Sequence, residues 1–429
     1  MTPTNQPINL PGRMLDAWRD AVLALAKFPR GTKRKDTPPE VLLGTALRQE
    51  TGAIIDLWES FTKERQQVSR GMLGSAQQTV AYLLGFHLVN AARARLLLKR
   101  LSDRHHVQAW IKEIARKHTP TTAAPVTEGE AEGKAEAKSK TKSESGVKQQ
   151  PLVSWYDLGC GTGAVAHAVS DFLLSAGLPP SALQMRLYDT SGSLLDAASL
   201  VLNQAACGAS IKTHRVGLER LDSSMVPLAP AGTMHGFSLG YVWNELEKNP
   251  VAKTRVLKLL RDQVQGSTLV LLLEPASQTF ARSAMELRDE MVKMGYLPLY
   301  PCLAPTPCPM LNLSRDWCYS EATWQQPKIM QTLDKSLGIS RQHLSGTLMA
   351  FATKDLAKSW RAEKTDAVIV GRPERIQPHL LKVKDRPKEK PATTFEYLLC
   401  TGSELKKVAP KTAEGAPLQR GLPFSDAPD

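Results

Sequence analysis

Apolar positions follow two different patterns, one before and one after a polar stretch that begins near residue 119. Between residues 13 and 117 apolar side chains recur every three or four positions, the spacing of helices with one buried face. Met14, Trp18 and Val22 begin this series. A second helix is expected after the two prolines at 38–39, and a third over about residues 71–101. The pattern predicts an α-helical N-terminal region over residues 1–118.

From residue 151 to 295 short apolar runs alternate with helical patterns. The expected strands are 153–157, 184–189, 234–239 and 267–274, and the expected helices are 164–176, 194–206 and 252–265. The run at 267–274 is apolar almost throughout, as in a central strand covered on both faces. Such alternation predicts an α/β domain with a doubly wound parallel sheet.

Two stretches are too polar to bury a core. Residues 119–150 consist mainly of Thr, Ala, Pro, Glu, Gly, Lys and Ser and contain no aromatic residue. We expect a disordered linker there and a disordered tail over residues 411–429. The remaining segment, residues 296–410, contains four of the six cysteines and is expected to form a C-terminal region with added strands.

The composition narrows the choice of partner. Of the 429 residues, 55 are Lys or Arg and 42 are Asp or Glu, a net charge of +13. This excess favours a polyanionic partner, although a generally basic surface explains it as well. Five basic residues close the third expected helix: Arg93, Arg95, Lys99, Arg100 and Arg104. They either stabilise the helix C-terminus or form a face for RNA.

No apolar run is long enough to cross a bilayer, so a membrane role is not expected. The first residues lack the basic and apolar segments of a secretory signal, and no Arg occurs before Arg13. We therefore expect a cytoplasmic protein. The sequence does not indicate an oligomeric state.

A glycine-rich turn follows the first expected strand and opens a helix. It reads Asp157-Leu-Gly159-Cys-Gly161-Thr-Gly163, and Asp189 ends the second strand. Glycines let a ligand approach the backbone closely, and an acid in the position of Asp189 can accept hydrogen bonds from ribose hydroxyls. The spacing resembles motif I of class I S-adenosylmethionine (SAM)-dependent methyltransferases. These five residues are the predicted cofactor-binding set.

The loop after the expected strand at 234–239 is where chemistry usually occurs in such folds. Here it contains Asn244 and Glu245 and lacks the D/N-P-P-Y/F stretch of many amino-methyltransferases. Both residues could orient a substrate, but a helix-start Asn and a solvated Glu explain them equally well. They are weak catalytic candidates, and Cys160 is better explained as a small filler of the glycine loop.

The remaining chemistry lies in the cysteines. Cys302, Cys308 and Cys318 are close in sequence and the first two are flanked by prolines, which favours a rigid loop. Without an export signal, metal ligation is a better explanation than disulfides, and Cys400 is the candidate fourth ligand. The wide spacing and the Cys-Pro step suit a [4Fe–4S] cluster better than zinc, which normally takes paired C-x₂-C hooks. Spacing alone leaves iron, zinc and unrelated buried cysteines open.

On these residues the chain resembles the Rsm22 family over most of residues 13–410. The resemblance rests on the glycine loop, on Asn244-Glu245-Leu246, on Glu274-Pro275, on the cysteine pattern, and on Val370–Pro373 with His379. It implies that Cys302, Cys308, Cys318 and Cys400 hold a [4Fe–4S] cluster. It also implies a role in maturation of the small ribosomal subunit through contact with 16S-type rRNA. Eukaryotic relatives are mitochondrial, whereas the N-terminus here suggests a bacterial member.

Three hypotheses follow. The first is a SAM-binding, iron–sulfur assembly factor that docks on small-subunit rRNA. The second is an active rRNA methyltransferase with Asn244 and Glu245 near the target base. The third is a zinc-stabilised RNA-binding module that keeps the methyltransferase fold without the activity.

Overall fold

The computed structural model describes residues 7–62, 75–118, 150–360, 367–369, 374–376, 394–408 and 423–424. The expected linker at 119–150 lies outside this set except for Gln150, and the expected tail at 411–429 except for residues 423–424. Val370–Pro373 and His379 also lie outside it. None of the helices in these ranges has the length and apolar character needed to cross a membrane.

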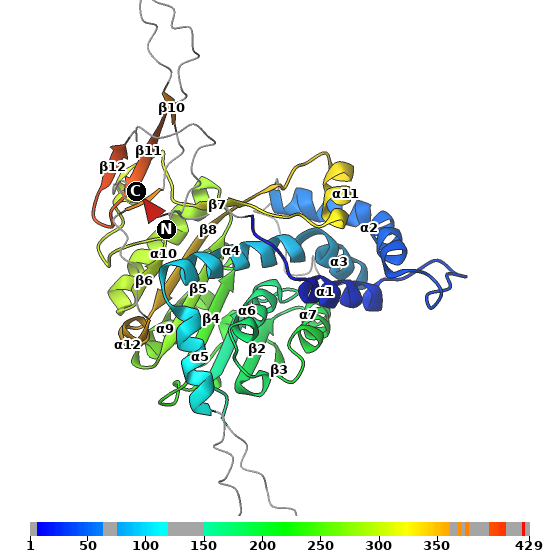
Figure 1. Ribbon diagram of the computed structural model, residues 1–429, viewed down its shortest axis with the longest axis horizontal. Coiled ribbons are helices and arrows are strands. Elements are labelled where there is room, and N and C mark those ends of the chain that lie inside the picture. Colours follow the sequence, from blue (N-terminus) through cyan, green and yellow to red (C-terminus); the bar gives the residue numbers. More distant parts are fainter. Residues whose placement is uncertain are drawn as a thin grey trace, which may run out of the picture.

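The centre of the described structure is an eight-stranded sheet of order β3-β2-β1-β4-β5-β8-β6, with β7 paired to β8 (Figure 1). Its strands are β1 (Val153–Leu158), β2 (Leu183–Asp189), β3 (Ser210–Arg215), β4 (Met234–Gly240), β5 (Thr268–Glu274), β6 (Leu297–Tyr300), β7 (Ser320–Thr323) and β8 (His343–Ala352). Strands β1 to β5 are parallel, and β8 runs antiparallel between β5 and β6. The chain order reverses between β1 and β4, so a ligand crevice is expected outside the carboxyl ends of these two strands.

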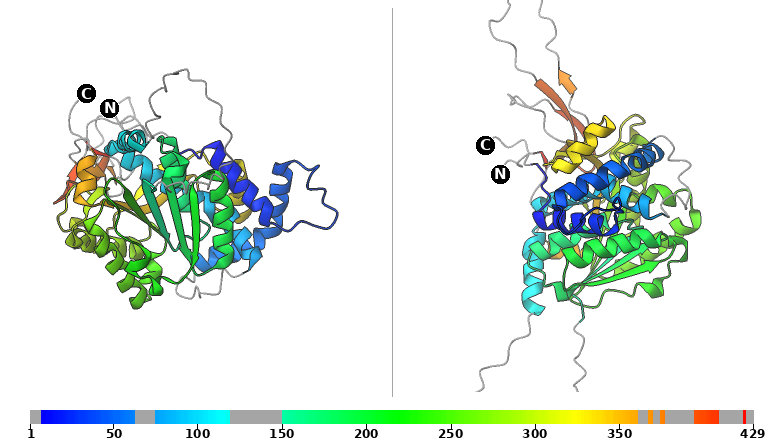
Figure 2. Two further views of the ribbon diagram at one scale, coloured as in Figure 1. Left: turned by 90° about the horizontal axis from the view of Figure 1, so that it is seen from below. Right: turned by 90° about the vertical axis from the view of Figure 1, so that its right-hand side faces the viewer.

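Helices cover both faces of this sheet (Figure 2). They include α6 (Ala164–Ser175), α7 (Gly192–Ala205), α8 (Trp243–Leu246), α9 (Pro250–Asp262), α10 (Gln278–Met294) and α12 (Lys354–Ser359), with short 3₁₀ turns η2 (Pro180–Ala182), η3 (Leu218–Arg220), η4 (Ser223–Met225) and η5 (Gln263–Gln265). Helix α11 (Lys328–Leu337) lies instead beside the N-terminal helices (Figure 1). Side chains of β1 alternate between two apolar cores: Trp155 packs with α6 and α7, and Tyr156 packs with α9 and α10. Every residue of β5 is buried, as its apolar sequence predicts. The predicted Rossmann-like core is confirmed.

The N-terminal residues are helical, as expected. Their helices are α1 (Gly12–Leu25), α2 (Pro39–Thr62), α3 (Ala76–Tyr82), the π-helical turn η1 (Leu83–His87), α4 (Leu88–Arg104) and α5 (Val107–His118). They share one apolar core with α6 and α7, so they do not form a separate body. Asp171 on α6 pairs with Arg13 on α1 (2.6 Å) and with Arg95 on α4. The expected third helix is therefore α3, η1 and α4 in succession, with a π-type widening in the middle.

A second, smaller sheet follows the main one. It contains β9 (Ala367–Ile369), β10 (Glu374–Ile376), β11 (Thr394–Cys400), β12 (Leu405–Val408) and β13 (Pro423–Phe424). Strands β11 and β12 form an antiparallel hairpin in which Cys400 pairs with Leu405. The hairpin lies beside the loop that joins β6 to β7, which contains the short turn η6 (Pro309–Asn312) (Figure 1). Strands β9 to β12 are the added strands expected for residues 296–410, whereas β13 lies in the stretch 411–429, where a disordered tail was expected.

Candidate cofactor loop and cysteine centre

The glycine loop joins β1 to α6 at the point where the sheet order reverses. Gly159, Gly161 and Gly163 all have positive φ, of 69°, 54° and 74°. A Cβ on Gly159 would lie 2.6 Å from Cγ2 of Val242, and one on Gly163 would lie 3.0 Å from Cβ of Ala198. Only glycine satisfies both the backbone conformation and the close packing. The loop is thus packed tightly against the segment after β4 and against α7.

Asp189 ends β2 directly beside this loop. One carboxylate oxygen accepts a hydrogen bond from the Gly161 N–H and the other from the Ser191 N–H, both at 2.9 Å. Burial raises the pKa of Asp189, and these backbone donors partly oppose the rise. Asp189 therefore lies directly beside the glycine loop, and ribose binding by its carboxylate stays a prediction.

Asp157 occupies a different environment from Asp189. It is almost fully buried, and its two oxygens accept hydrogen bonds from Ser238 Oγ (2.7 Å) and the Ala166 N–H (3.2 Å). Burial raises its pKa to about 6, with those two bonds opposing the rise. In this position Asp157 fixes the end of β1 to β4 and α6. A direct contact with the amino-acid end of a cofactor stays a prediction.

Two side chains from the N-terminal helices lie against the glycine loop, and the sequence analysis did not identify them. His87 Nδ1 lies 3.0 Å from Thr162 Oγ1, and its Nε2 lies 3.1 Å from Nδ1 of His167 on α6. Tyr82 lies next to Gly161, since a Cβ built there would be 3.9 Å from the tyrosine hydroxyl. In the sequence, Tyr82 and His87 belong to the apolar face of a predicted helix. The sequence pattern gives no sign that they contact a loop some 75 residues further along the chain.

The loop after β4 carries backbone strain. Tyr241 has φ of 64°, the only positive value at a non-glycine residue in the described ranges. The amide of Asn244 donates to the Tyr241 carbonyl (3.1 Å) and to Oε2 of Glu274 (2.6 Å), while Oε1 of Glu274 accepts from the Trp243 N–H. Asn244 therefore stabilises the conformation of its own loop. Glu245 is exposed on α8. This arrangement assigns neither residue a catalytic role.

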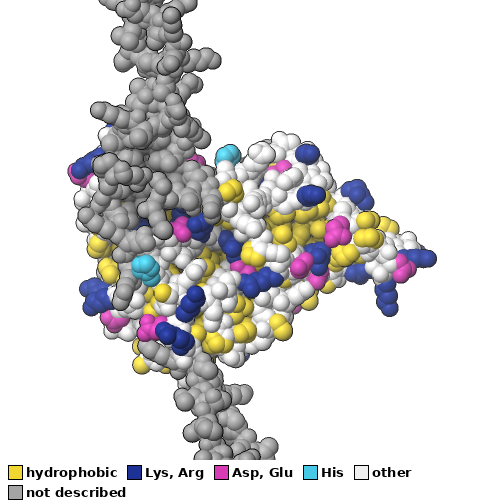
Figure 3. Space-filling view, in the orientation of Figure 1, with side chains coloured by type: hydrophobic (Ala, Val, Ile, Leu, Met, Phe, Trp, Pro, Cys, Tyr) yellow, Lys and Arg dark blue, Asp and Glu magenta, His cyan; other side chains and the backbone are white. Residues whose placement is uncertain are grey.

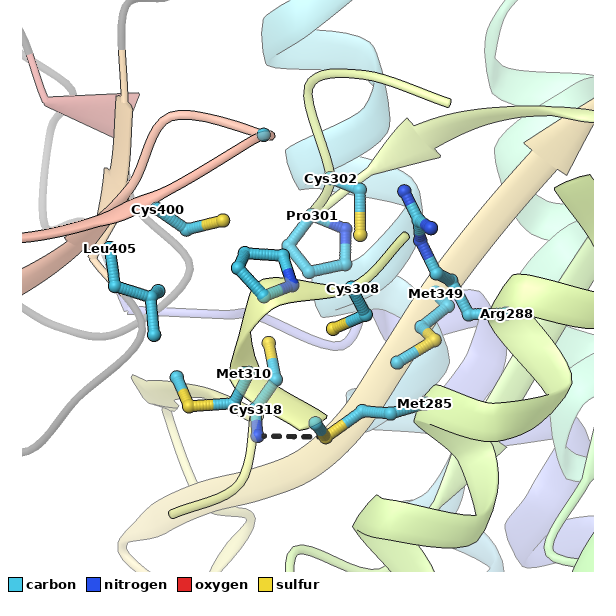
Figure 4. Close-up of a pocket in the computed structure, with 12 residues that line it drawn as sticks. Met285, Arg288, Pro301, Cys302, Cys308, Met310, Cys318, Met349, Cys400 and Leu405 are labelled. Carbon is cyan, nitrogen blue, oxygen red and sulfur yellow. Dashed lines mark hydrogen bonds between the residues drawn. The ribbon is translucent and has the colours of Figure 1, made fainter. Parts of the chain in front are cut away.

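Four cysteines line one cavity at the edge of the main sheet (Figure 4). Cys302, Cys308 and Cys318 come from the loop between β6 and β7, and Cys400 comes from the end of β11. The other lining residues are mostly apolar and include Met285, Met310, Met349, Pro301 and Leu405, with one cation, Arg288. The predicted ligands, although scattered in the sequence, thus meet at one place.

Three arginines hold the cysteine loop in shape by donating to its backbone carbonyls. Arg104 on α4 donates to the carbonyls of Pro301 (2.9 Å) and Cys302 (3.0 Å). Arg288 on α10 donates to the carbonyls of Ala304 (2.6 Å) and Thr306. Arg282 on α10 donates to three carbonyls further along, those of Leu311, Leu313 and Asp316. Because an irregular loop leaves carbonyls unpaired, these donors provide hydrogen bonds that secondary structure would otherwise supply.

Burial affects two thiols of this cavity, those of Cys308 and Cys400. Burial raises the pKa of Cys308 to about 11 and also raises the pKa of Cys400. Burial lowers the pKa of Arg288, but the neighbouring Cys302 and Asp289 outweigh this effect and leave it raised. Thiolate ligation to a metal would therefore release protons from Cys308 and Cys400.

No three His, Cys, Asp or Glu side chains in the described ranges are grouped closely enough to hold one metal ion. The free space between the lining side chains is about 20 Å³, room for roughly one water molecule. The four thiols thus surround a common space without converging on a single point. Within the described residues the cavity is therefore not a preformed metal site, and this holds for a zinc ion and for a cluster alike.

The basic residues at the end of α4 have internal partners. Arg95 pairs with Asp171, Arg104 holds the cysteine loop, and Lys99 pairs with Asp103 at 2.9 Å. Arg100 is buried, and Arg93 lies over the ring of Tyr241 at 5.8 Å. Of the two explanations open from the sequence, the structure supports packing and stabilisation over an exposed RNA face.

No protein-family model and no curated protein matches the chain. Solved structures with a similar fold include a proposed RNA methyltransferase from Pyrococcus horikoshii (8% identity, 48% of this chain and 77% of that one, TM-score 0.28). A precorrin-6y C5,15-methyltransferase from Geobacter metallireducens GS-15 has 10% identity, 48% and 81% coverage, and a TM-score of 0.28. A TehB-like SAM-dependent methyltransferase from Corynebacterium glutamicum has 12% identity, 48% and 81% coverage, and a TM-score of 0.26. At such values these likenesses carry no argument about this chain.

The fold class rests on the chain's own geometry. A parallel sheet of order 3-2-1-4-5, extended here by an antiparallel strand between the fifth strand and the edge, is a doubly wound, Rossmann-like arrangement. The glycine loop and Asp189 lie at its switch point. The chain is a Rossmann-like α/β protein with a cysteine-lined cavity at the far edge of its sheet.

Proposed function

We propose that this protein is a SAM-binding, [4Fe–4S]-containing, methyltransferase-like assembly factor of the small ribosomal subunit, acting in the bacterial cytoplasm and related to the Rsm22 family. One observation carries the proposal. The four cysteines implied by the family resemblance line a single cavity, although Cys400 belongs to a separate sheet. Unrelated buried cysteines would have no reason to share one space.

The chemistry of the cavity suits a cluster better than a single ion. In a [4Fe–4S] cluster each thiolate binds a different iron, so its four ligands surround the group at a wider spacing than the ligands of one zinc ion. Methionine and leucine side chains exclude water, and the Arg288 guanidinium offsets part of the negative charge of the thiolates.

The proposed role of the cluster is structural. Four protein thiolates leave no iron open to a substrate, and the group would tie the β11–β12 hairpin to the loop after β6. The cluster itself would supply sulfur-bridged iron bonds between two parts of the chain. The protein's own residues position the two parts. Arg104, Arg282 and Arg288 hold the loop backbone by hydrogen bonds, and Gly402 permits the hairpin to approach the loop.

Metal analysis of protein purified without oxygen tests the cluster. We expect about four iron and four sulfide per chain and a broad absorbance near 400 nm. Cys302→Ser and Cys400→Ser should each lose most of the iron, whereas Cys207→Ser should keep it, because Cys207 is exposed and remote from the cavity. Zinc at one per chain, or full iron in the Cys400→Ser protein, would contradict the proposal.

SAM binding is supported by the loop geometry and by the position of Asp189 beside Gly161. Calorimetric titration of the holoprotein with SAM tests it. Asp189→Asn should weaken binding about tenfold or more, because an amide replaces one ribose-facing acceptor oxygen. Asp196→Asn on the following helix is the matched control and should leave the affinity unchanged. Equal affinity in the two variants would remove Asp189 from the site.

The rRNA partner is supported by the net charge of +13 and by the family resemblance. Catalysis is a separate matter, because Asn244 is engaged within its own loop. Radiolabelled methyl transfer from SAM to immature small subunits separates an assembly factor from an active rRNA methyltransferase. We expect binding of the subunits without incorporation of label.

A further inference from the structure

A strongly basic loop projects from the body of the protein between α1 and α2. It extends away from the sheet in both ribbon views, and Lys and Arg side chains gather at its tip in the space-filling view (Figures 1, 2 and 3). Its basic residues are Lys27, Arg30, Lys33, Arg34 and Lys35, all of them exposed, and Asp36 is its one acidic residue.

Local hydrogen bonds hold this loop in a defined shape. Thr32 Oγ1 donates to the Pro29 carbonyl (2.8 Å), and Thr37 Oγ1 and the Asp36 N–H donate to the Lys33 carbonyl at 2.9 and 3.1 Å. Arg34 folds back over the ring of Phe28, 4.9 Å from its centroid, and donates to the Leu23 carbonyl. A loop held in this way loses less conformational entropy on binding than a loose basic tail.

Four of these cations have no ion-pair partner within the part of the chain that the structure describes. They are Lys27, Arg30, Lys33 and Lys35. The basic residues of α4 differ from them, because they are paired or buried. The projecting loop is therefore a concentrated, uncompensated positive charge placed well outside the protein body. Such a charge has no internal structural use.

We infer that this loop binds the phosphate backbone of the RNA partner without reading its sequence. The inference rests on the proposed function for the identity of the RNA. Three of the four free cations are lysines, compact charges that attract phosphate but lack the rigid fork with which arginine recognises bases or carboxylates. The one aromatic ring of the loop, Phe28, is covered by Arg34 and is not open for base stacking. Contacts of this kind position a protein on RNA and depend steeply on salt.

The test uses the full-length holoprotein in which Lys27, Arg30, Lys33 and Lys35 are all changed to Ser. Its matched control has Lys99, Lys253, Lys258 and Lys293 changed to Ser, which removes the same charge from ion-paired surface positions. Binding to a 16S-type rRNA transcript and to an unrelated structured transcript of equal length is measured from 50 to 300 mM salt. A poly-glutamate chain serves as the acidic protein probe.

The loop variant should lose affinity for both transcripts by the same factor, about 10²-fold at low salt. The slope of log K against log salt should fall by roughly 3 to 4, about 0.9 for each lost phosphate contact. The control variant should keep most of the affinity and most of the salt dependence, and the melting temperatures of both variants should match that of the original protein.

If the slope of log K against log salt is unchanged in the loop variant, the inference about the loop is wrong, but the proposed function still stands. Weakened binding of poly-glutamate but not of RNA assigns the loop to an acidic protein and also overturns it. Absence of RNA binding by the original protein overturns the proposed function and the inference together.

Discussion

Thr306 Oγ1 donates a hydrogen bond to the Gly402 carbonyl at 2.6 Å, and this contact joins the cysteine loop to the β11–β12 hairpin. Gly402 has φ of +98°, and a Cβ at this position would lie 2.9 Å from Cβ of Ala304 and 3.2 Å from its backbone nitrogen. The hairpin can reach the loop only because this residue has no side chain. The approach places Cys400 in the same cavity as Cys302.

Gly402→Ala should therefore separate Cys400 from the other thiols. We expect a loss of about 2 to 3 kcal/mol in the free energy of unfolding, from left-handed strain together with the clash. The iron content should fall as well. Chemical denaturation and metal analysis of the same preparation measure both effects.

Gly338→Ala is the control for that experiment. Gly338 ends α11 with φ of +64°, but nothing lies within 4 Å of a Cβ built on it. This variant carries the backbone strain without the clash and should lose only about 1 kcal/mol. Its iron content should be normal. Equal iron loss in the two variants would mean that general destabilisation, and not the hairpin approach, controls the cavity.

Arg104→Ala tests whether α4 supports the cysteine loop. The guanidinium donates to the Pro301 and Cys302 carbonyls, and burial lowers its pKa, with Cys302 and Tyr300 opposing this. Removal leaves two carbonyls without donors, at a cost of about 2 to 4 kcal/mol. Lys99→Ala, five residues earlier on the same helix, breaks only an exposed pair with Asp103 and should cost under about 0.5 kcal/mol. If both variants unfold at the same denaturant concentration, Arg104 does not support the loop.

Much of the fold followed from local patterns. The run at 267–274 is apolar because β5 is buried on both faces, and the strand spacing gave the doubly wound core. The glycine loop and Asp189 were also predictable, since each directly follows or ends a strand that the apolar pattern predicts. Each of these features is signalled by a short stretch of sequence: an apolar run, a glycine-rich turn or an acid at a strand end.

The features that sequence missed depend on contacts between distant segments. His87 reads as part of an apolar helix face, and only the packing of α4 against α6 brings it to Thr162. The arginines of α4 read as a possible RNA face, whereas tertiary structure gives them internal partners. The sequence pattern did not indicate a role for the loop at residues 27–36, because its position outside the protein body is determined by the tertiary structure. Periodicity carries no information on any of these relationships.

Thr162→Val tests the link between the N-terminal helices and the glycine loop. The change keeps the shape of the side chain but removes the hydroxyl that lies 3.0 Å from His87 Nδ1. Loss of one buried hydrogen bond should weaken SAM binding by about five- to tenfold. Thr213→Val on the exposed strand β3 makes the same chemical change away from the loop and should have no effect. Calorimetry with SAM compares them, and indistinguishable affinities would separate His87 from cofactor binding.

The buried histidine pair should make the protein sensitive to mild acid. Burial, with the nearby charges of Arg95 and Arg13, lowers the pKa of His167 to about 3, and burial together with His167 lowers the pKa of His87. A histidine whose folded pKa lies below its unfolded value of about 6.5 gives its full stabilisation above that value and loses it as the pH falls. His167 alone should therefore lower the free energy of unfolding by about 2 kcal/mol between pH 7 and pH 5.

The His167→Gln variant tests this expectation. Glutamine cannot take up a proton, so the free energy of unfolding of this variant should fall less steeply over the same interval. His343→Gln on the exposed start of β8 is the control and should keep the original slope. Denaturant titrations at half-unit pH steps measure these slopes, and parallel curves for all three proteins would show that His167 is not the group responsible.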